Sequence, residues 1–322
     1  MKPKILLTGK NGQLGDDLRQ ILPRLGEVIA TDREQCDLLR PAQIRNRIRE
    51  LRPALIVNAA AYTAVDQAEK DEALACAINS EAPAIMAEEA KKIGAALVHF
   101  STDYVFDGAN SSPYAENDSP NPISAYGRTK LAGEQAVADS GANHLIFRTE
   151  WVYSTRGKNF LLTILRLATQ REELRIVCDQ LGAPTWSRQI AGATVEALGQ
   201  ICNRTDETAA WSKRTGTYHM TAAGETSWYE FTQAILQEAA QSSNSAAWLQ
   251  AATNGKELLT RRVVPITAAD YPTAARRPAY SVLSNAKLNR VFGIQLPDWR
   301  EQLRRAFSVN PRGTPEGATP VI

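Results

Sequence analysis

Short apolar segments alternate with helical patterns over the first 150 residues, and this alternation most constrains the fold. The apolar segments lie at 4–8, 27–31, 54–58, 96–100 and 144–148. Stretches with helical periodicity separate them, at 13–22, 41–51, 65–93 (two helices) and 125–138. Strands that alternate with helices form βαβ units and a parallel sheet. The sequence therefore predicts an α/β fold with a doubly wound, Rossmann-type sheet.

The pattern changes after Trp151, which predicts a smaller C-terminal substrate-binding lobe. We expect a dinucleotide-binding domain at 1–150 and the second lobe at 151–308, with 187–223 returning to the first domain. The tail at 309–322 is rich in Pro, Gly and Thr and is predicted to be disordered. The other expected elements are helices at 159–173, 188–201 and 227–241, strands at 174–178 and 217–221, and polar loops at 203–216 and 241–255.

Composition argues against several classes of protein. The net charge of +2 comes without long Lys or Arg runs, so the sequence predicts no nucleic-acid partner. No apolar stretch approaches the roughly 18 residues of a membrane span. The four cysteines and three histidines are scattered without metal-ligand spacing, so we expect no zinc site. Reduced thiols are typical of a cytoplasmic protein.

A glycine-rich turn, GKNGQLG, follows the first strand and opens a helix. Gly9, Gly12 and Gly15 let the backbone approach a pyrophosphate at the positive end of that helix. The spacing is G-x-x-G-x-x-G, which departs from the general dinucleotide fingerprint. Glycines here also serve packing, but the strand–turn–helix context favours cofactor binding.

Asp32 ends the second strand, about 20 residues after the turn, where an acidic side chain accepts hydrogen bonds from ribose hydroxyls and suits NADH. Arg33 follows at once and could instead meet the 2′-phosphate of NADPH. A plain turn role for Asp32 is the alternative. The sequence leaves the choice of cofactor open. The small residues 59–61 leave room for a ligand beyond the third strand.

Tyr126 and Lys130 lie four residues apart on a predicted helix and so share one face. A nearby positive charge lowers the pKa of a tyrosine, so we expect Tyr126 to exchange a proton with a carbonyl or hydroxyl oxygen. Thr102, at the end of the fourth strand, could bond the same oxygen. On their own, these residues are better explained by an amphipathic helix face and a capping hydroxyl.

Two further features suit a nucleotide sugar. Trp151 follows the fifth strand and could stack on a sugar ring, although packing is the usual role of a tryptophan. Arg276 and Arg277 offer two guanidinium groups suited to a diphosphate, with a solvated pair as the alternative.

Three runs carry a resemblance to a known family: VNAAAYTAVDQAE at 57–69, STDYVFDG at 101–108 and YGRTKLAGE at 126–134. With the glycine turn they resemble the extended short-chain dehydrogenase/reductase family, over most of residues 1–300. The resemblance implies reduction of the 4-keto group of dTDP-4-dehydro-L-rhamnose by NADPH or NADH. Its product would supply rhamnose to a cell-surface polysaccharide such as the O-antigen of lipopolysaccharide.

The resemblance also implies roles for individual residues. Tyr126 would donate the proton, Thr102 would tune the same oxygen, and Lys130 would hold the nicotinamide ribose. The implied substrate-binding residues are Thr102, Asp103, Tyr104, Trp151, Arg276 and Arg277. The implied cofactor-binding residues are Gly9, Asn11, Gly12, Gln13, Leu14, Asp32, Arg33, Asp37, Leu38, Ala59, Ala60, Ala61, Thr63, Ala64, Val65, Ser101, Tyr126 and Lys130.

Several positions depart from the family's usual pattern. Tyr62 stands where histidine is common, and Glu150 where serine is common, which adds a negative charge beside the substrate site. Some relatives form a dimer bridged by a divalent metal. Asp17 matches one ligand of that metal, but Arg188 and Ala286 stand at the others. We therefore expect no bridging Mg²⁺, and a monomer or weak homodimer.

Two other functions remain open for this fold. A nucleotide-sugar dehydratase or epimerase is one, but such dehydratases place Glu after the Thr-Asp pair, where this chain has Tyr104. A non-catalytic regulatory subunit is the other. It would have no need of Thr102, Tyr126 and Lys130 together.

Overall fold

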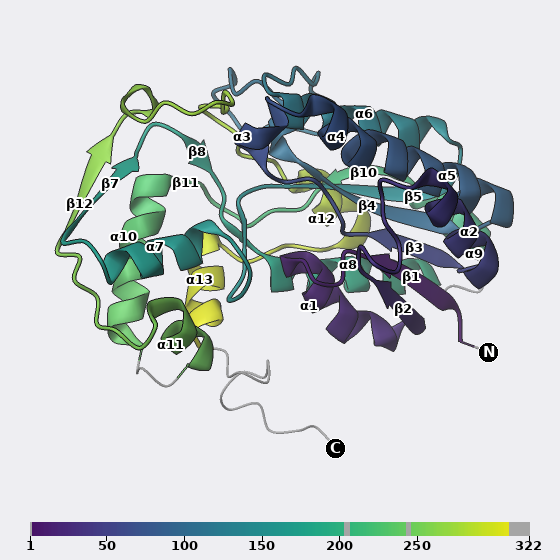
Figure 1. Cartoon of the computed structure of the whole chain (residues 1–322). Helices are drawn as coiled ribbons and strands as arrows, with labels where there is room; N and C mark the ends of the chain where they lie inside the picture. Colours follow the sequence, from purple (N-terminus) through teal and green to yellow (C-terminus); the bar gives the residue numbers. More distant parts are fainter. Residues whose placement is uncertain (1, 203–206, 243–245, 309–322) are drawn as a thin grey trace.

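The five predicted strands of the first half form one parallel sheet. The computed structural model describes residues 2–202, 207–242 and 246–308. A sixth strand from the second half joins the sheet beside β5, and the order is β10-β5-β4-β3-β1-β2 (Figure 1). The strands are β1 (Lys4–Thr8), β2 (Glu27–Thr31), β3 (Leu55–Asn58), β4 (Ala96–Thr102), β5 (Asn143–Thr149) and β10 (Gly216–His219). The α/β fold class predicted from the alternation is confirmed.

Alternate residues of each strand enter two separate apolar cores, one on each face of the sheet. In β1, Ile5 and Leu7 face one core and Leu6 faces the other. The first core is covered by α1 (Gln13–Ile21), α8 (Ser187–Cys202), α9 (Glu207–Arg214) and α12 (Ala286–Phe292). The second is covered by α2 (Pro41–Leu51), α5 (Ala82–Ile93) and α6 (Ala125–Asp139). A sheet buried on both faces explains why its strands read as continuous apolar runs.

The stretch 65–93 holds α3 (Val65–Ala68) and then one continuous helical run, so two helices were correctly expected. That run comprises α4 (Glu72–Cys76), a π-helical turn (Ala77–Glu81) and α5. The π turn buries Asn79, whose side chain bonds both backbone groups of Tyr62. The distorted helix thereby holds the loop that follows β3, at the edge of the sheet where ligands bind.

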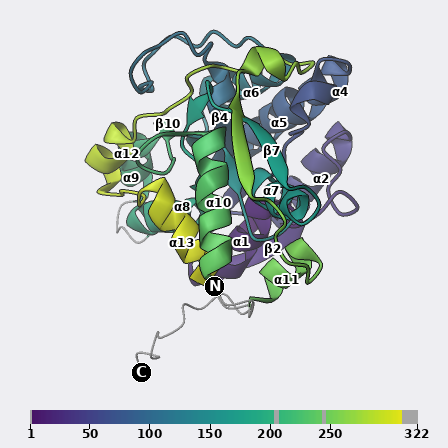
Figure 2. The ribbon, with the colours of Figure 1, turned by 90° about the vertical axis from the view of Figure 1, so that its left-hand side faces the viewer.

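The second lobe packs its own core beside the sheet, and Figure 2 looks onto it. Strands β7 (Glu173–Val177) and β12 (Arg262–Ile266) pair in parallel. Short pairs connect the lobes: β6 (Val152–Tyr153) with β9 (Thr185–Trp186), and β8 (Leu181–Gly182) with β11 (Thr226–Ser227). Its helices are α7 (Phe160–Ala168), α10 (Trp228–Gln241), α11 (Ala247–Thr253) and α13 (Trp299–Ser308). None of the described helices has the length and apolar character that a membrane crossing requires.

The loop predictions were wrong in two places. The segment 203–216 contains α9, and 241–255 contains α11. Each of these short helices is held by an apolar anchor, since Trp211 packs into the first core and Leu249 into that of the second lobe. Tertiary packing outweighed the polar composition there. The predicted tail 309–322 lies outside the described residues, and the domain boundaries at 150 and 308 stay a proposal.

Candidate active site

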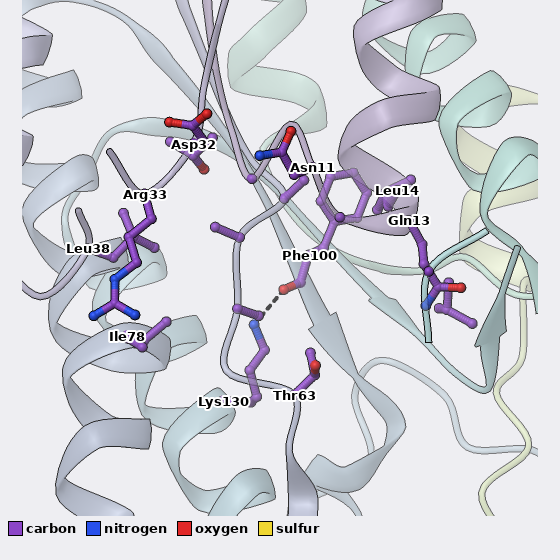
Figure 3. Close-up of a pocket in the computed structure, with 18 of the residues that line it drawn as sticks. Asn11, Gln13, Leu14, Asp32, Arg33, Leu38, Thr63, Ile78, Phe100 and Lys130 are labelled. Carbon is purple, nitrogen blue, oxygen red and sulfur yellow. Dashed lines mark hydrogen bonds between the residues drawn. The ribbon is translucent and has the colours of Figure 1, made fainter. Parts of the chain in front are cut away.

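A cavity of about 610 Å³ opens along the carboxyl ends of the first five strands. All candidate cofactor residues line it except Ala64 and Val65, which the structure does not bring to its wall. Figure 3 shows Asp32 and Arg33 at one end of the cavity and Lys130 reaching toward Phe100 in another part of its wall. Doubly wound sheets bind their ligands at this edge.

The glycine turn is built from close backbone contacts. Gly9 has φ +74°, a conformation that favours glycine, and its carbonyl accepts a hydrogen bond of 2.9 Å from the Gly12 N–H. A Cβ on Gly15 would lie 2.0 Å from the Gly9 oxygen. No side chain caps the start of α1, and its first N–H groups lack helical partners where Gln13 and Leu14 line the cavity. These residues fit the pyrophosphate of a dinucleotide.

The far end of the cavity carries both charges that the sequence predicts there. Asp32 forms an ion pair of 3.0 Å with Lys10, and the hydrogen bond from Lys10 holds the pKa of Asp32 below its usual range. Arg33 contacts Asp37 at 3.7 Å, yet 77% of its side chain is exposed. Because Lys10 already offsets the negative charge of Asp32, the exposed guanidinium of Arg33 adds an accessible positive charge to this end of the cavity.

Tyr126 and Thr102 meet where α6 begins. Ser124 caps that helix by accepting a hydrogen bond of 3.1 Å from the Gly127 N–H, which places Tyr126 in the first turn. The Thr102 hydroxyl lies beside that of Tyr126, and Tyr104 packs edge-on against the Tyr126 ring at 5.6 Å.

The expectation that Lys130 lowers the pKa of Tyr126 is wrong for this structure. Desolvation raises the pKa of Tyr126 to about 12, and the only lowering influence on that pKa comes from the Thr102 hydroxyl. Lys130 is directed to β4 instead, with Nζ 2.6 Å from the Phe100 carbonyl oxygen and 3.2 Å from His99 Nε2. Tyr126 therefore keeps its proton at neutral pH, as a proton donor requires.

Two buried carboxyl groups lie behind Thr102. Asp103 accepts a hydrogen bond of 2.9 Å from the Thr102 hydroxyl, and Glu150 accepts one of 3.2 Å from Ser281 and one of 3.3 Å from the Leu283 N–H. Burial raises the pKa of Asp103 to about 6 and that of Glu150 well above its usual range, and the charge of Asp103 adds to the effect on Glu150. The expectation that Glu150 carries a negative charge is therefore wrong, because this side chain is held as the neutral acid.

The Glu150→Gln variant is expected to become increasingly more stable than the wild type as the pH rises from 5 to 8. A carboxyl whose pKa is higher folded than unfolded, near 4.3, destabilises the fold increasingly above pH 4.3. Glutamine removes that contribution, so we expect a gain of about 1–3 kcal/mol by pH 8. Urea unfolding at pH 5, 6.5 and 8 measures it, with the exposed Glu50→Gln as control. A difference that does not change with pH would contradict the neutral Glu150.

Trp151 is held on one face by another aromatic ring. Its φ of +44° is unusual for a residue other than glycine. The ring stacks on Trp228 at 3.4 Å, and Trp228 packs against Phe160. A Cβ on Gly182 would lie 2.5 Å from Trp151 Cε2. Trp228 thus occupies one face of the ring predicted to stack on a sugar, and that stacking stays a prediction.

The two candidate arginines lie in different surroundings. Arg277 forms an ion pair of 2.7 Å with Asp66 and lies near Tyr104. Arg276 is exposed. The role of both arginines in binding a diphosphate stays a prediction.

Asp17, the one match to a metal ligand, has other partners. Its carboxylate accepts hydrogen bonds from Ser187 Oγ at 2.5 Å and from Arg156 at 3.1 Å. Within the described ranges no group of three or more acidic, His or Cys side chains could hold a metal ion. The absence of a bridging metal stays a prediction.

Sequence reasoning missed part of the cavity wall. Thr8, Phe100 and Thr149 lie at strand ends, so the rule that placed Ser101 could have found them. Gly157 and Lys158 come from the loop after β6, and no local signal marks them. The missed lining residues are Thr8, Cys36, Leu39, Ile78, Phe100, Thr149, Val152, Gly157 and Lys158.

The parallel sheet, the glycine turn and the Thr102–Tyr126 pair define an NAD(P)-dependent oxidoreductase of the short-chain dehydrogenase/reductase class. A family model described as the RmlD substrate binding domain matches residues 2–310, and the chain belongs to this family.

Several of the similar proteins share one name. A dTDP-4-dehydrorhamnose reductase of Burkholderia thailandensis is 50% identical over 92% of this chain and 95% of its own. One of Escherichia coli K12 is 41% identical over 94% and 97%. A crystal structure of dTDP-4-dehydrorhamnose reductase from Bacillus anthracis, in complex with NADP, superposes with a TM-score of 0.82 at 34% identity, covering 95% of this chain and 99% of that one.

Proposed function

We propose that this protein reduces the 4-keto group of dTDP-4-dehydro-L-rhamnose to a hydroxyl, giving dTDP-L-rhamnose. The observation that carries the proposal is Tyr126, a phenol that keeps its proton, lies beside Thr102 and lines the cavity. The names of relatives at 41–50% identity, which cover nearly the whole chain, support the same reaction. NADPH supplies the hydride when it is bound.

The roles of the site residues follow from their positions. The Tyr126 hydroxyl donates a proton to the keto oxygen, and the adjacent Thr102 hydroxyl is placed to contact the same oxygen. Arg277, which pairs with Asp66, and the nearby Tyr104 bind the substrate. The N–H groups at the start of α1 hold the pyrophosphate of the cofactor.

We expect NADPH to bind more tightly than NADH. Lys10 offsets the charge of Asp32, and Arg33 is exposed at the same end of the cavity. An accessible guanidinium favours the 2′-phosphate that only NADPH carries. The NADP in the similar Bacillus anthracis structure agrees with this order.

The rival functions fit the site less well. Tyr104 stands where a dehydratase needs Glu, and burial raises its pKa further, so it is a poor base for elimination. A regulatory subunit would not require Tyr126 at the wall of the cavity with Thr102 beside it. We also propose that the protein works in the cytoplasm, consistent with its four free cysteines, as a monomer or weak homodimer.

The purified protein is expected to oxidise NADPH when dTDP-4-dehydro-L-rhamnose is added, and more slowly to oxidise NADH at equal concentration. The absorbance of the reduced nicotinamide measures both rates, and dTDP-L-rhamnose is identified by chromatography. A protein that binds NADPH but never consumes it with this sugar would overturn the proposal. Consumption with another keto sugar alone would overturn the choice of substrate.

A further inference from the structure

Arg277 is held by an ion pair that joins the two lobes. Its guanidinium forms two bonds with the Asp66 carboxylate, Nη2 to Oδ2 at 2.7 Å and Nη1 to Oδ1 at 3.2 Å. Asp66 lies in α3, directly after the loop that lines the cofactor cavity, whereas Arg277 belongs to the segment that follows β12. Exposed ion pairs contribute little to stability, and 46% of the Asp66 side chain is exposed. The pair is therefore better explained by the direction that it gives to Arg277.

The backbone around Arg277 fixes the same geometry. The Ala275 N–H donates to Asp66 Oδ1 at 3.0 Å, and the Ala275 carbonyl accepts from Arg277 Nη1 at 3.1 Å. The next residue, Pro278, packs closely on Gly108, where an added Cβ would lie 2.6 Å from the Pro278 Cβ. One carboxylate thus holds both the guanidinium and the backbone that precedes it.

These bonds use one edge of the guanidinium and leave another. A guanidinium is planar and carries five N–H donors in a rigid fork. Asp66 and Ala275 take both Nη1 donors and one Nη2 donor. The Nε–H and the second Nη2–H lie side by side on a different edge, with the spacing that binds two oxygens of a phosphate. An anion can therefore bind Arg277 at this edge while Asp66 keeps its place.

The Arg277 guanidinium also lies close to the candidate reaction site. Its charge is near enough to act on the Tyr104 hydroxyl, and the Tyr104 ring packs edge-on against Tyr126 at 5.6 Å. An anion beside Arg277 is thus separated from the expected proton donor by a single side chain. In a nucleotide sugar, the width of one sugar ring separates the diphosphate at C1 from a keto group at C4. The two separations are compatible.

We propose that Asp66 is a positioning residue, which aims the remaining edge of Arg277 at the diphosphate of a nucleotide sugar. Asp66 does not touch the ligand and acts through Arg277. The proposal rests on the proposed function, which supplies the diphosphate, and it gives Asp66 a role in binding rather than in proton transfer. Without the carboxylate the guanidinium can turn, so each bound diphosphate has to order it again.

Calorimetric titration of the full chain with dTDP, in the presence of NADPH, tests the proposal without turnover. We expect the dissociation constant for dTDP to rise about tenfold in Asp66→Asn. Glu72→Gln is the matched control and should bind dTDP as the wild type does. It breaks a similar two-bond pair, between Glu72 and Arg128 at 2.9 and 3.0 Å, outside the cavity wall. Unchanged or tighter binding of dTDP by Asp66→Asn would overturn the proposal.

A double-mutant cycle separates positioning from a merely structural role. Arg277→Met should weaken dTDP binding by about tenfold or more, and Asp66→Asn should then add less than about twofold, because Asp66 acts through Arg277. An equal loss from Asp66→Asn with and without Arg277 would overturn the proposal.

The binding results are independent of the reaction, because dTDP contains no sugar. A wild type that binds dTDP without reducing the keto sugar would contradict the proposed reaction alone. A wild type that binds neither dTDP nor UDP would overturn the role of Asp66 as well.

Discussion

Tyr126→Phe is expected to lower kcat by about 10²–10⁴-fold, the usual contribution of a positioned proton donor. The phenol lines the cavity, lies beside Thr102 and keeps its proton, since burial raises its pKa to about 12. Phenylalanine preserves the ring and its edge-on contact with Tyr104 and removes only the hydroxyl. Binding of NADPH and the melting temperature should stay near those of the wild type.

Steady-state rates with the keto sugar, together with a fluorescence titration of NADPH, separate these effects. Tyr229→Phe is the matched control, because its hydroxyl contacts only Gln233 on the surface of α10 and its loss should leave kcat unchanged. If Tyr126→Phe kept more than about a tenth of the wild-type kcat, another group would have to be the proton donor.

Gly15→Ala is expected to have the largest effect on the cofactor site. The added methyl would lie 2.0 Å from the Gly9 carbonyl oxygen, a backbone atom, so α1 must move away from the turn. Overpacking of this kind costs about 3 kcal/mol or more. The displaced turn would also lose the alignment of its N–H groups, and we expect the dissociation constant for NADPH to rise at least about tenfold.

Denaturant unfolding and NADPH titration measure both consequences. Gly192→Ala, on the exposed side of α8, is the matched control, because a Cβ there meets no atom within 4 Å. Replacing an unstrained helical glycine with alanine stabilises by about 0.4–1 kcal/mol. Equal stability of the two variants would show that the Gly9–Gly15 contact is not what demands glycine.

Local sequence predicted the sheet well because its strands are buried on both faces, and burial leaves uninterrupted apolar runs. It also located Thr102 and Asp32, since residues that follow a parallel strand collect at one edge of the sheet. It could not predict α9 or α11, short helices that are held by Trp211 and Leu249 in cores built from distant segments.

The protonation states depended on neighbours that no local pattern names. Lys130 was expected to act on Tyr126 four residues away, but the nearer contacts of Nζ are Phe100 and His99 on β4. Glu150 was expected to add a charge. It lies instead against Ser281, about 130 residues further along the chain, and beside Asp103, where burial keeps it neutral.

The sequence by itself determined the class of fold, the glycine turn and the set Thr102, Tyr126 and Lys130. These depend on periodicity, strand ends and spacing along one helix, which are properties of neighbouring residues. Only the tertiary structure decided that Trp228 covers Trp151, that Arg277 rather than Arg276 pairs with Asp66, and which side chains carry charge. Those outcomes depend on desolvation and on hydrogen-bond partners, and both are created only when distant segments pack together.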